Sequence, residues 1–207
     1  MRLSILTAAA LLFSLNFTAA RENSTPAESE HVSAAAVVRE INLARENPNL
    51  YATFVAESRP FHMIEHGRAV DEAVRFLRKT RPLPPLTLSP GMSRGAADHC
   101  AEQVDGQLGH DGNDRTTPGD RISRYGSWSA TWGENISYSR KTAREVVLAL
   151  IIDDGVRSRG HRKNVFNPKF NVAGAAFGPH ARYRTVCTID FAGGYAERAE
   201  ALVAKNP

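Results

Sequence analysis

Cysteine is scarce in this chain of 207 residues, which contains only Cys100 and Cys187. Two cysteines so far apart in the sequence do not form the closely spaced pairs of a zinc motif. In an oxidising compartment they could form one disulfide, and two buried thiols are an equal alternative. A bridge requires Cα atoms within about 7 Å of each other, which the sequence does not reveal. The disulfide therefore stays an open alternative at this point.

Several patterns of known function are also missing. No segment after residue 20 has the run of about 20 apolar residues that spans a bilayer. The net charge is mildly positive at +4, but basic residues are interleaved with acids and form no stripe that would follow phosphates. No G-x-S-x-G turn is present, and the distant cysteines do not indicate a thiol enzyme. We therefore expect no nucleic-acid partner, no transmembrane segment in the domain and no nucleophilic hydrolase.

The length fits one domain of ordinary size, with separate segments at both ends. Residues 1–20, MRLSILTAAALLFSLNFTAA, contain one arginine, an apolar run and small residues at the end. This layout predicts a secretory signal peptide cleaved near Ala20, because the apolar core is short for a membrane anchor. We expect a flexible lead-in over 21–32, a domain over 33–195 and a tail over 196–207. Such a protein would be secreted or periplasmic.

Apolar spacing and capping signals predict helices in the first part of the domain and strands in the last. The expected helices are 33–47, 70–79, one from Ser89 to about Gln103, and one after a capping box at Thr142 and Glu145. Residues 105–133 are rich in Gly, Asp, Asn, Thr and Pro, which predicts a loop or short turns. Residues 171–178 and 183–191 are β-rich. This order predicts an α+β fold with helices packed on an antiparallel sheet.

The segment HMIEH at 62–66 matches H-x-x-E-H, the inverted zinc-peptidase pattern. That chemistry needs a helix that continues past both histidines, and a third ligand further along the chain. Pro60 and Gly67 bracket the segment closely, so a surface turn with incidental histidines is the favoured interpretation.

A second set of candidates is spread along the chain. His110 lies in LGHDG, Glu134 in WGENIS and His161 in RGHRKN, while Asp153 and Asp154 end the last predicted helix. Two imidazoles with two or three carboxylates suit a divalent metal or general acid–base chemistry. Each residue alone also has a purely structural explanation, and spacing does not show that they meet.

The segments LGHDG, GENIS and RGHRKNVFNPKF occur in this order and are followed by VAGAAFG and a strand ending in IDFAGGY. Together they resemble the CAP superfamily, the SCP-like extracellular proteins that include cysteine-rich secretory, antigen 5 and pathogenesis-related proteins. The resemblance covers about residues 35–192, and the low cysteine count resembles the bacterial branch. It implies an α–β–α sandwich, with a central antiparallel sheet between helical layers and a cleft.

In that family the cleft holds two histidines and two acids. The resemblance assigns these positions to His110, Glu134 and His161. Relatives carry the second acid three residues after a tryptophan, and Leu150 stands in the tryptophan position here. The second acid is therefore expected at Asp153, with Asp154 as the rival.

The resemblance implies three functional hypotheses. In the first, which we favour, His110 and His161 bind a zinc-like divalent metal, Glu134 and Asp153 support them, and a small molecule or lipid is a further possible ligand. In the second, a metal-assisted peptidase or esterase would use Glu134 and Asp153 in acid–base roles. In the third, the domain is purely structural and the cleft vestigial. Nothing in the sequence identifies a protein partner.

Overall fold

A computed structural model describes residues 32–62 and 64–199. The predicted signal peptide, most of the predicted lead-in and most of the predicted tail lie outside these ranges, so those assignments stay predictions. No helix within the described ranges is long and apolar enough to cross a membrane.

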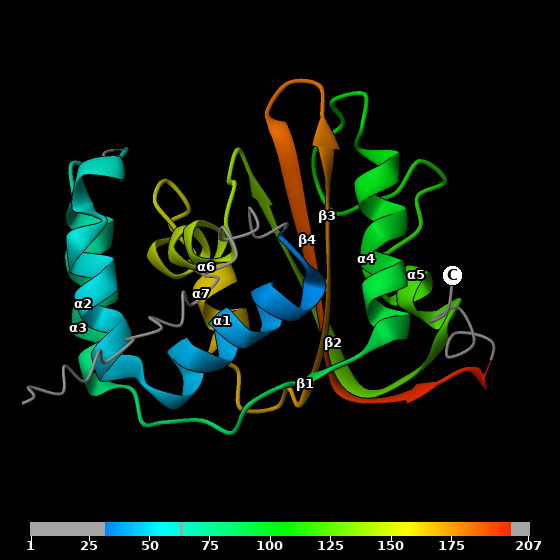
Figure 1. Cartoon of the computed structure of the whole chain (residues 1–207), viewed down its shortest axis with the longest axis horizontal. Coiled ribbons are helices and arrows are strands. Elements are labelled where there is room, and N and C mark those ends of the chain that lie inside the picture. The colour runs from blue at the N-terminus through cyan, green and yellow to red at the C-terminus, as the bar shows by residue number, and fades with distance from the viewer. Residues whose placement is uncertain (1–31, 63, 200–207) are drawn as a thin grey trace, which may run out of the picture.

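The chain begins with helices and ends with a long hairpin (Figure 1). The first half contains α1 (Ala34–Glu46), α2 (Pro48–Glu57), the 3₁₀ turn η1 (Arg59–Phe61), α3 (Arg68–Lys79), β1 (Thr87–Leu88) and α4 (Pro90–Glu102). The second half contains α5 (Pro118–Ser123), β2 (Gly126–Tyr138), α6 (Ala143–Ile152), α7 (Gly160–Val165), β3 (Val172–His180) and β4 (Arg184–Glu197).

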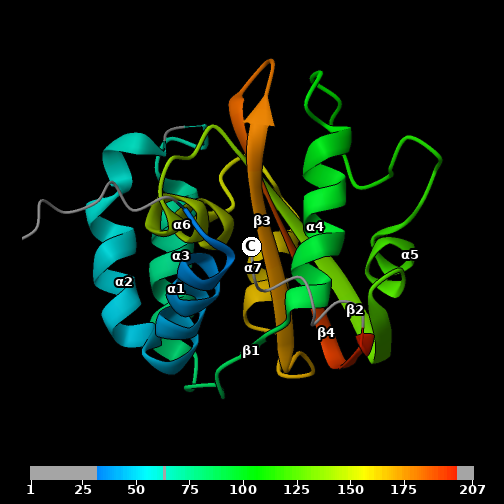
Figure 2. The same cartoon turned by 45° about the vertical axis from the view of Figure 1, so that its right-hand side comes forward.

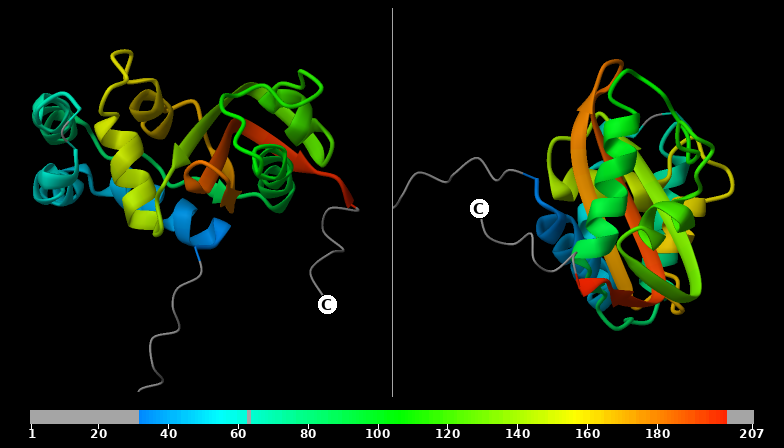
Figure 3. Two further views of the ribbon diagram at one scale, coloured as in Figure 1. Left: turned by 90° about the horizontal axis from the view of Figure 1, so that it is seen from above. Right: turned by 90° about the vertical axis from the view of Figure 1, so that its right-hand side faces the viewer.

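The sheet has the strand order β1-β3-β4-β2 and lies between two helical layers. The long strands β3, β4 and β2 are antiparallel, and only the short β1 pairs in parallel, with β3. Helices α1, α2, α3, α6 and α7 lie on one side of the sheet, and α4 and α5 lie on the other (Figures 1 and 2). The view from above in Figure 3 shows the same layers. The predicted α–β–α sandwich is confirmed.

The two faces of β4 bury two separate cores, because successive side chains of a strand point to opposite faces. Cys187, Ile189 and Phe191 pack into the larger core with α1, α2, α3 and α6. Val186 packs on the other side, in a small cluster with Cys100 of α4. The close fit of α4 to the sheet depends on Gly174 of β3, where an added Cβ would lie 2.3 Å from the backbone nitrogen of Ser93.

This alternation also decides the state of the cysteines. Cys100 and Cys187 are buried free thiols in cores on opposite faces of the sheet. The disulfide that the composition allowed is therefore not formed, and the alternative of two buried thiols holds. Burial raises the pKa of both thiols, which keeps them protonated and unreactive.

Local signals in the sequence found four of the helices. The hydroxyl of Ser89 accepts a hydrogen bond from the Met92 backbone nitrogen at 3.0 Å, as expected of a helix N-cap. Thr142 likewise caps α6, but the Glu145 carboxylate accepts from the Lys141 nitrogen, so the predicted capping box is only half formed.

Several elements were missed, among them η1, β1 and α7. Helix α2 begins with Pro48, directly after the predicted helix 33–47, and proline is favoured at the first position of a helix. The predicted loop 105–133 contains α5, which begins with a complete capping box at Thr117 and Asp120. It also contains the first half of β2, so Glu134 lies within a strand and not at the end of a loop.

Candidate functional site

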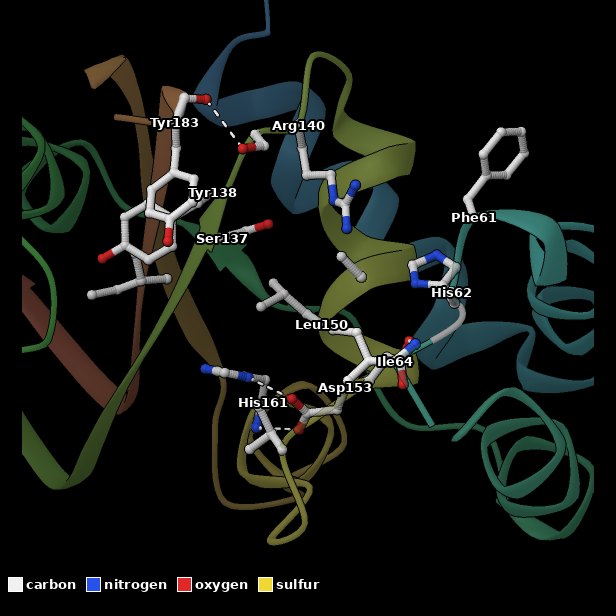
Figure 4. A pocket seen from close by; sticks show the side chains of 15 residues that line it. Phe61, His62, Ile64, Ser137, Tyr138, Arg140, Leu150, Asp153, His161 and Tyr183 are labelled. Carbon is white, nitrogen blue, oxygen red and sulfur yellow. Dashed lines mark hydrogen bonds and ion pairs between the residues drawn. The ribbon is translucent and has the colours of Figure 1, made fainter. Parts of the chain in front are cut away.

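The end of α6 holds the first pair of predicted site residues. Asp153 is the C-cap of α6 in a left-handed conformation (φ 58°), which aspartate tolerates better than most residues, and its side chain is buried. Its Oδ1 lies 2.7 Å from Nδ1 of His161, and its Oδ2 accepts from the His161 backbone nitrogen at 3.0 Å (Figure 4). One carboxylate thus fixes both the ring and the backbone of His161.

Asp154 has a different role. Its two carboxylate oxygens accept hydrogen bonds from the backbone nitrogens of Ile64 and Glu65, each at 2.9 Å. Of the two candidate acids, Asp153 is therefore the one that contacts His161, while Asp154 secures the turn after η1.

The HMIEH segment contributes no zinc-peptidase helix. Residues 64–67 form turns, and His62 caps the short η1. Glu65, which would have to be the catalytic base, accepts from both terminal nitrogens of Arg159, at 2.7 and 2.8 Å. These bonds, together with one from the Gly155 backbone nitrogen, lower the pKa of Glu65 to about 2. Arg159 also pairs with Glu72 of α3, so this cluster braces the turn between α6 and α7.

The second pair is His110 with Glu134. Nδ1 of His110 lies 2.7 Å from Oε1 of Glu134, whose side chain is only 1% exposed, whereas that of His110 is 52% exposed. The hydrogen bond to Glu134 raises the pKa of His110 and outweighs the opposing effect of burial. Glu134 thus orients an imidazole that is open to solvent.

Two further residues complete this buried group, and neither was anticipated from the sequence. Arg121 of α5 donates to Oε2 of Glu134 at 2.7 Å and to the carbonyl oxygen of His110 at 3.0 Å. Asp190 of β4 stands opposite Glu134 in the strand register, is fully buried, and has no hydrogen-bond partner within the described ranges. Burial, followed by the negative charge of Glu134, raises the pKa of Asp190 well above its usual range. The only sequence signal was one acid in the apolar run of β4.

Hydrogen bonds join the two histidine–acid pairs through β2 and α7. The Asn135 side chain donates to the carbonyl oxygen of His161 at 3.0 Å. The Asn164 side chain donates to the Glu134 carbonyl oxygen at 3.2 Å and to the Asn135 side chain at 2.9 Å. The four predicted residues therefore form two pairs on neighbouring elements. Within the described ranges, no three His, Cys, Asp or Glu residues form a group that could hold a metal ion.

One of the two pairs lines a cleft. This cleft has a volume of about 390 Å³. On one side it is lined by the C-terminal half of β2, and on the other by η1, the turn after η1 and the end of α6. Asp153 and His161 line its floor (Figure 4). Leu150, Ile64 and Arg140 form other parts of its wall, whereas His110 and Glu134 do not line it. The cleft thus brings His161 together with a mixed apolar and basic wall.

The family model described as CAP, cysteine-rich secretory protein family, matches residues 38–191. The chain belongs to the CAP family. This CAP domain is 29% identical over 158 residues to the uncharacterised protein YkwD of Bacillus subtilis, covering 75% of this chain and 58% of YkwD. It therefore spans less than two thirds of that relative.

Solved structures similar to this CAP domain come from bacterial proteins. An extracellular protein containing an SCP domain from Bacillus anthracis is 25% identical, with a TM-score of 0.42, 53% of this chain covered and 34% of the other. An outer surface protein from Borrelia burgdorferi is 16% identical, with a TM-score of 0.45 and coverages of 72% and 93%.

Proposed function

We propose that this CAP domain is an exported binding module that takes up a divalent metal through Nε2 of His110 and of His161. The observation that carries the proposal is that each histidine binds a buried carboxylate through Nδ1. A carboxylate at Nδ1 favours the tautomer with the proton on that nitrogen and leaves a lone pair on Nε2. Neither Nε2 atom has a hydrogen-bond partner within the described ranges.

The chemistry of the two donor atoms supports an open metal site. Two neutral imidazoles suit zinc or a similar transition metal, and such a metal would act as a Lewis acid toward a bound ligand. Because no third protein ligand gathers with them in the described part of the chain, water or a ligand would complete the coordination. Glu134 and Asp153 would orient the two rings through their contacts with Nδ1.

The contacts of the acids support binding more than hydrolysis. Both oxygens of Glu134 have partners, Oε1 with His110 and Oε2 with Arg121, and the side chain is almost fully buried. A general base must instead reach the proton that it removes. We therefore assign Glu134 a positioning role, and we retain the metal-assisted peptidase or esterase only as the alternative.

Export is supported by the signal-like segment 1–20, and small-ligand binding by the volume of the cleft. About 390 Å³ falls within the usual range for small-molecule pockets. A lipid ligand remains a prediction from the family resemblance.

Calorimetric titration of the chain without residues 1–20 with zinc chloride at neutral pH tests the proposal. We expect saturable binding that weakens by about tenfold or more in His110→Ala and in His161→Ala, and by about 10–100-fold in Glu134→Gln. His66→Asn is the matched control, because His66 is exposed and its positive φ of 54° suits asparagine. No binding by the wild type, or full binding by both alanine variants, would reject the metal site and leave the structural role.

A further inference from the structure

The cleft contains an unpaired strand edge. Strand β2 is the last in the sheet and has a partner, β4, on one side only. The Ser139 nitrogen donates to the Thr185 oxygen across that pair at 3.0 Å, and hydrogen-bonded positions alternate along an antiparallel ladder. Ser137 therefore also bonds to β4, whereas the N–H and C=O groups of Ile136 and Tyr138 point to the free side.

These backbone groups have no partner in the described part of the chain. Further along the same edge, the Glu134 carbonyl oxygen accepts from the Asn164 side chain, so α7 covers the edge there. Ile136 and Tyr138 lie beyond this cover, and both line the cleft. Ile136 is only 7% exposed, so a partner would have to enter the cleft to reach these groups, but an unpaired edge of this kind is a template for another strand.

Arg140 adds a charge to the same edge. It follows β2, lines the cleft, and forms no ion pair with the carboxylates of the described ranges. Its Nε is buried without a hydrogen-bond partner. Figure 4 shows its side chain extending toward His62, and burial followed by the Arg140 charge lowers the pKa of His62. A buried guanidinium nitrogen without an acceptor favours an incoming carboxylate.

The opposite wall is apolar. Leu150 and Ala149 of α6 line the cleft across from β2, and Ile64 and Phe61 are also among its lining residues. Ile64 and Phe61 are 73% and 79% exposed, so their apolar surface is accessible to a ligand. The cleft thus offers backbone groups on one wall, apolar contacts on the other and a cation at one end, while Asp153 and Asp154 also line it and are already engaged by hydrogen bonds.

We propose that this cleft binds an extended peptide segment carrying an acidic side chain, as an added strand on β2. The peptide backbone pairs with Ile136 and Tyr138, its carboxylate pairs with Arg140, and its apolar side chains pack on Leu150 and Ile64. Main-chain bonds give affinity in such strand addition, and alternate side chains give specificity. The site adjoins His161 but requires no metal, so it goes beyond the metal-binding role.

Fluorescence anisotropy with defined peptides tests the proposal, in buffer with a chelator so that the result is independent of metal binding. The probe is fluorescein-labelled Thr-Val-Thr-Val-Glu amide. We expect saturable binding, a loss of about tenfold or more when Gln replaces the Glu of the probe, and a similar loss in Arg140→Gln. The two changes together should cost little more than either alone. Arg39→Gln, at an exposed arginine of α1, should bind like the wild type.

A second comparison isolates the backbone contacts. The same peptide with N-methyl groups on both valines keeps its side chains but loses amide donors, so it should not bind. Amide exchange measured by NMR should slow at Ile136 and Tyr138 when the unmodified probe is added, and stay unchanged at Asn135 and Ser137, which already bond to β4. Absence of saturable binding by the wild type, equal binding of the methylated peptide, or unchanged exchange at Ile136 and Tyr138 would overturn the proposal.

Discussion

Replacing Asp153 by asparagine should weaken the domain through one specific contact. Asparagine has almost the same shape and also tolerates a positive φ, so the backbone conformation at the end of α6 is retained. The amide oxygen can still accept from the His161 backbone nitrogen. The amide nitrogen then faces Nδ1 of His161 in place of the carboxylate oxygen, which lay at 2.7 Å.

The size of the effect follows from this exchange. A hydrogen bond to a charged group stabilises a fold by about 1.5–3 kcal/mol, and that contribution is lost. The loss is partly offset if the ring accepts a bond from the new amide. To accept this bond at Nδ1, the His161 ring must adopt the tautomer with its proton on Nε2, which is the atom proposed to bind metal. We therefore expect Asp153→Asn to lower the free energy of unfolding by about 1–3 kcal/mol. At about 2–4 °C per kcal/mol, the melting temperature should fall measurably.

Urea unfolding of a double-mutant cycle measures the contact directly. The cycle comprises the wild type, Asp153→Asn, His161→Ala and the double variant, and its coupling energy should be about 1 kcal/mol or more. Asp154→Asn is the control. It removes one of two bonds to the turn backbone and should cost about 0.5–1.5 kcal/mol without coupling to His161→Ala.

The reasoning fails if the Asp153 cycle is additive within experimental error. It also fails if the Asp154 cycle shows the larger coupling, because the second acid of the site would then be Asp154.

Three further predictions concern the buried groups around the site. In Glu134→Gln, the pKa of His110 should fall when titrated by NMR, because the bond to Glu134 is the main cause that raises it. The raised pKa of Asp190 means that this residue binds its proton more tightly in the folded than in the unfolded chain. The free energy of unfolding of the wild type should therefore decrease as the pH rises above the usual carboxyl range. Urea unfolding of Asp190→Asn at the same pH values should show a smaller decrease. A fall in stability with pH that is equally steep in both proteins would contradict this. Because Cys100 and Cys187 are free, a reducing agent should leave the melting temperature unchanged, and mass spectrometry should find both thiols alkylated only after unfolding.

The elements that could be predicted from the sequence are those held by interactions between residues close together in the chain. The helix that begins after Ser89 was predicted because its cap lies three residues from the nitrogen that it binds, and such signals are readable in a short window. Strand β2 was not predicted, because the Gly- and Ser-rich sequence of its first half is typical of a loop and it becomes a strand only through pairing with β4.

For the site, the sequence by itself supplied the residue types and, through the order of short segments, the family. It proposed His110, Glu134, Asp153 and His161, but it could not say which acid meets which histidine. The pairing follows from the folded chain, because His110 and Glu134 are 24 residues apart in the sequence and meet only when the segment that carries His110 packs near β2.

The same holds for features with no local signal. Arg121 and Asp190 join the site because α5 and β4 bring them against Glu134. Cys100 and Cys187 stay apart because a strand turns alternate side chains to opposite faces. The open edge of β2 exists because the strand order places β2 last in the sheet, a property of the assembled sheet that no single segment encodes.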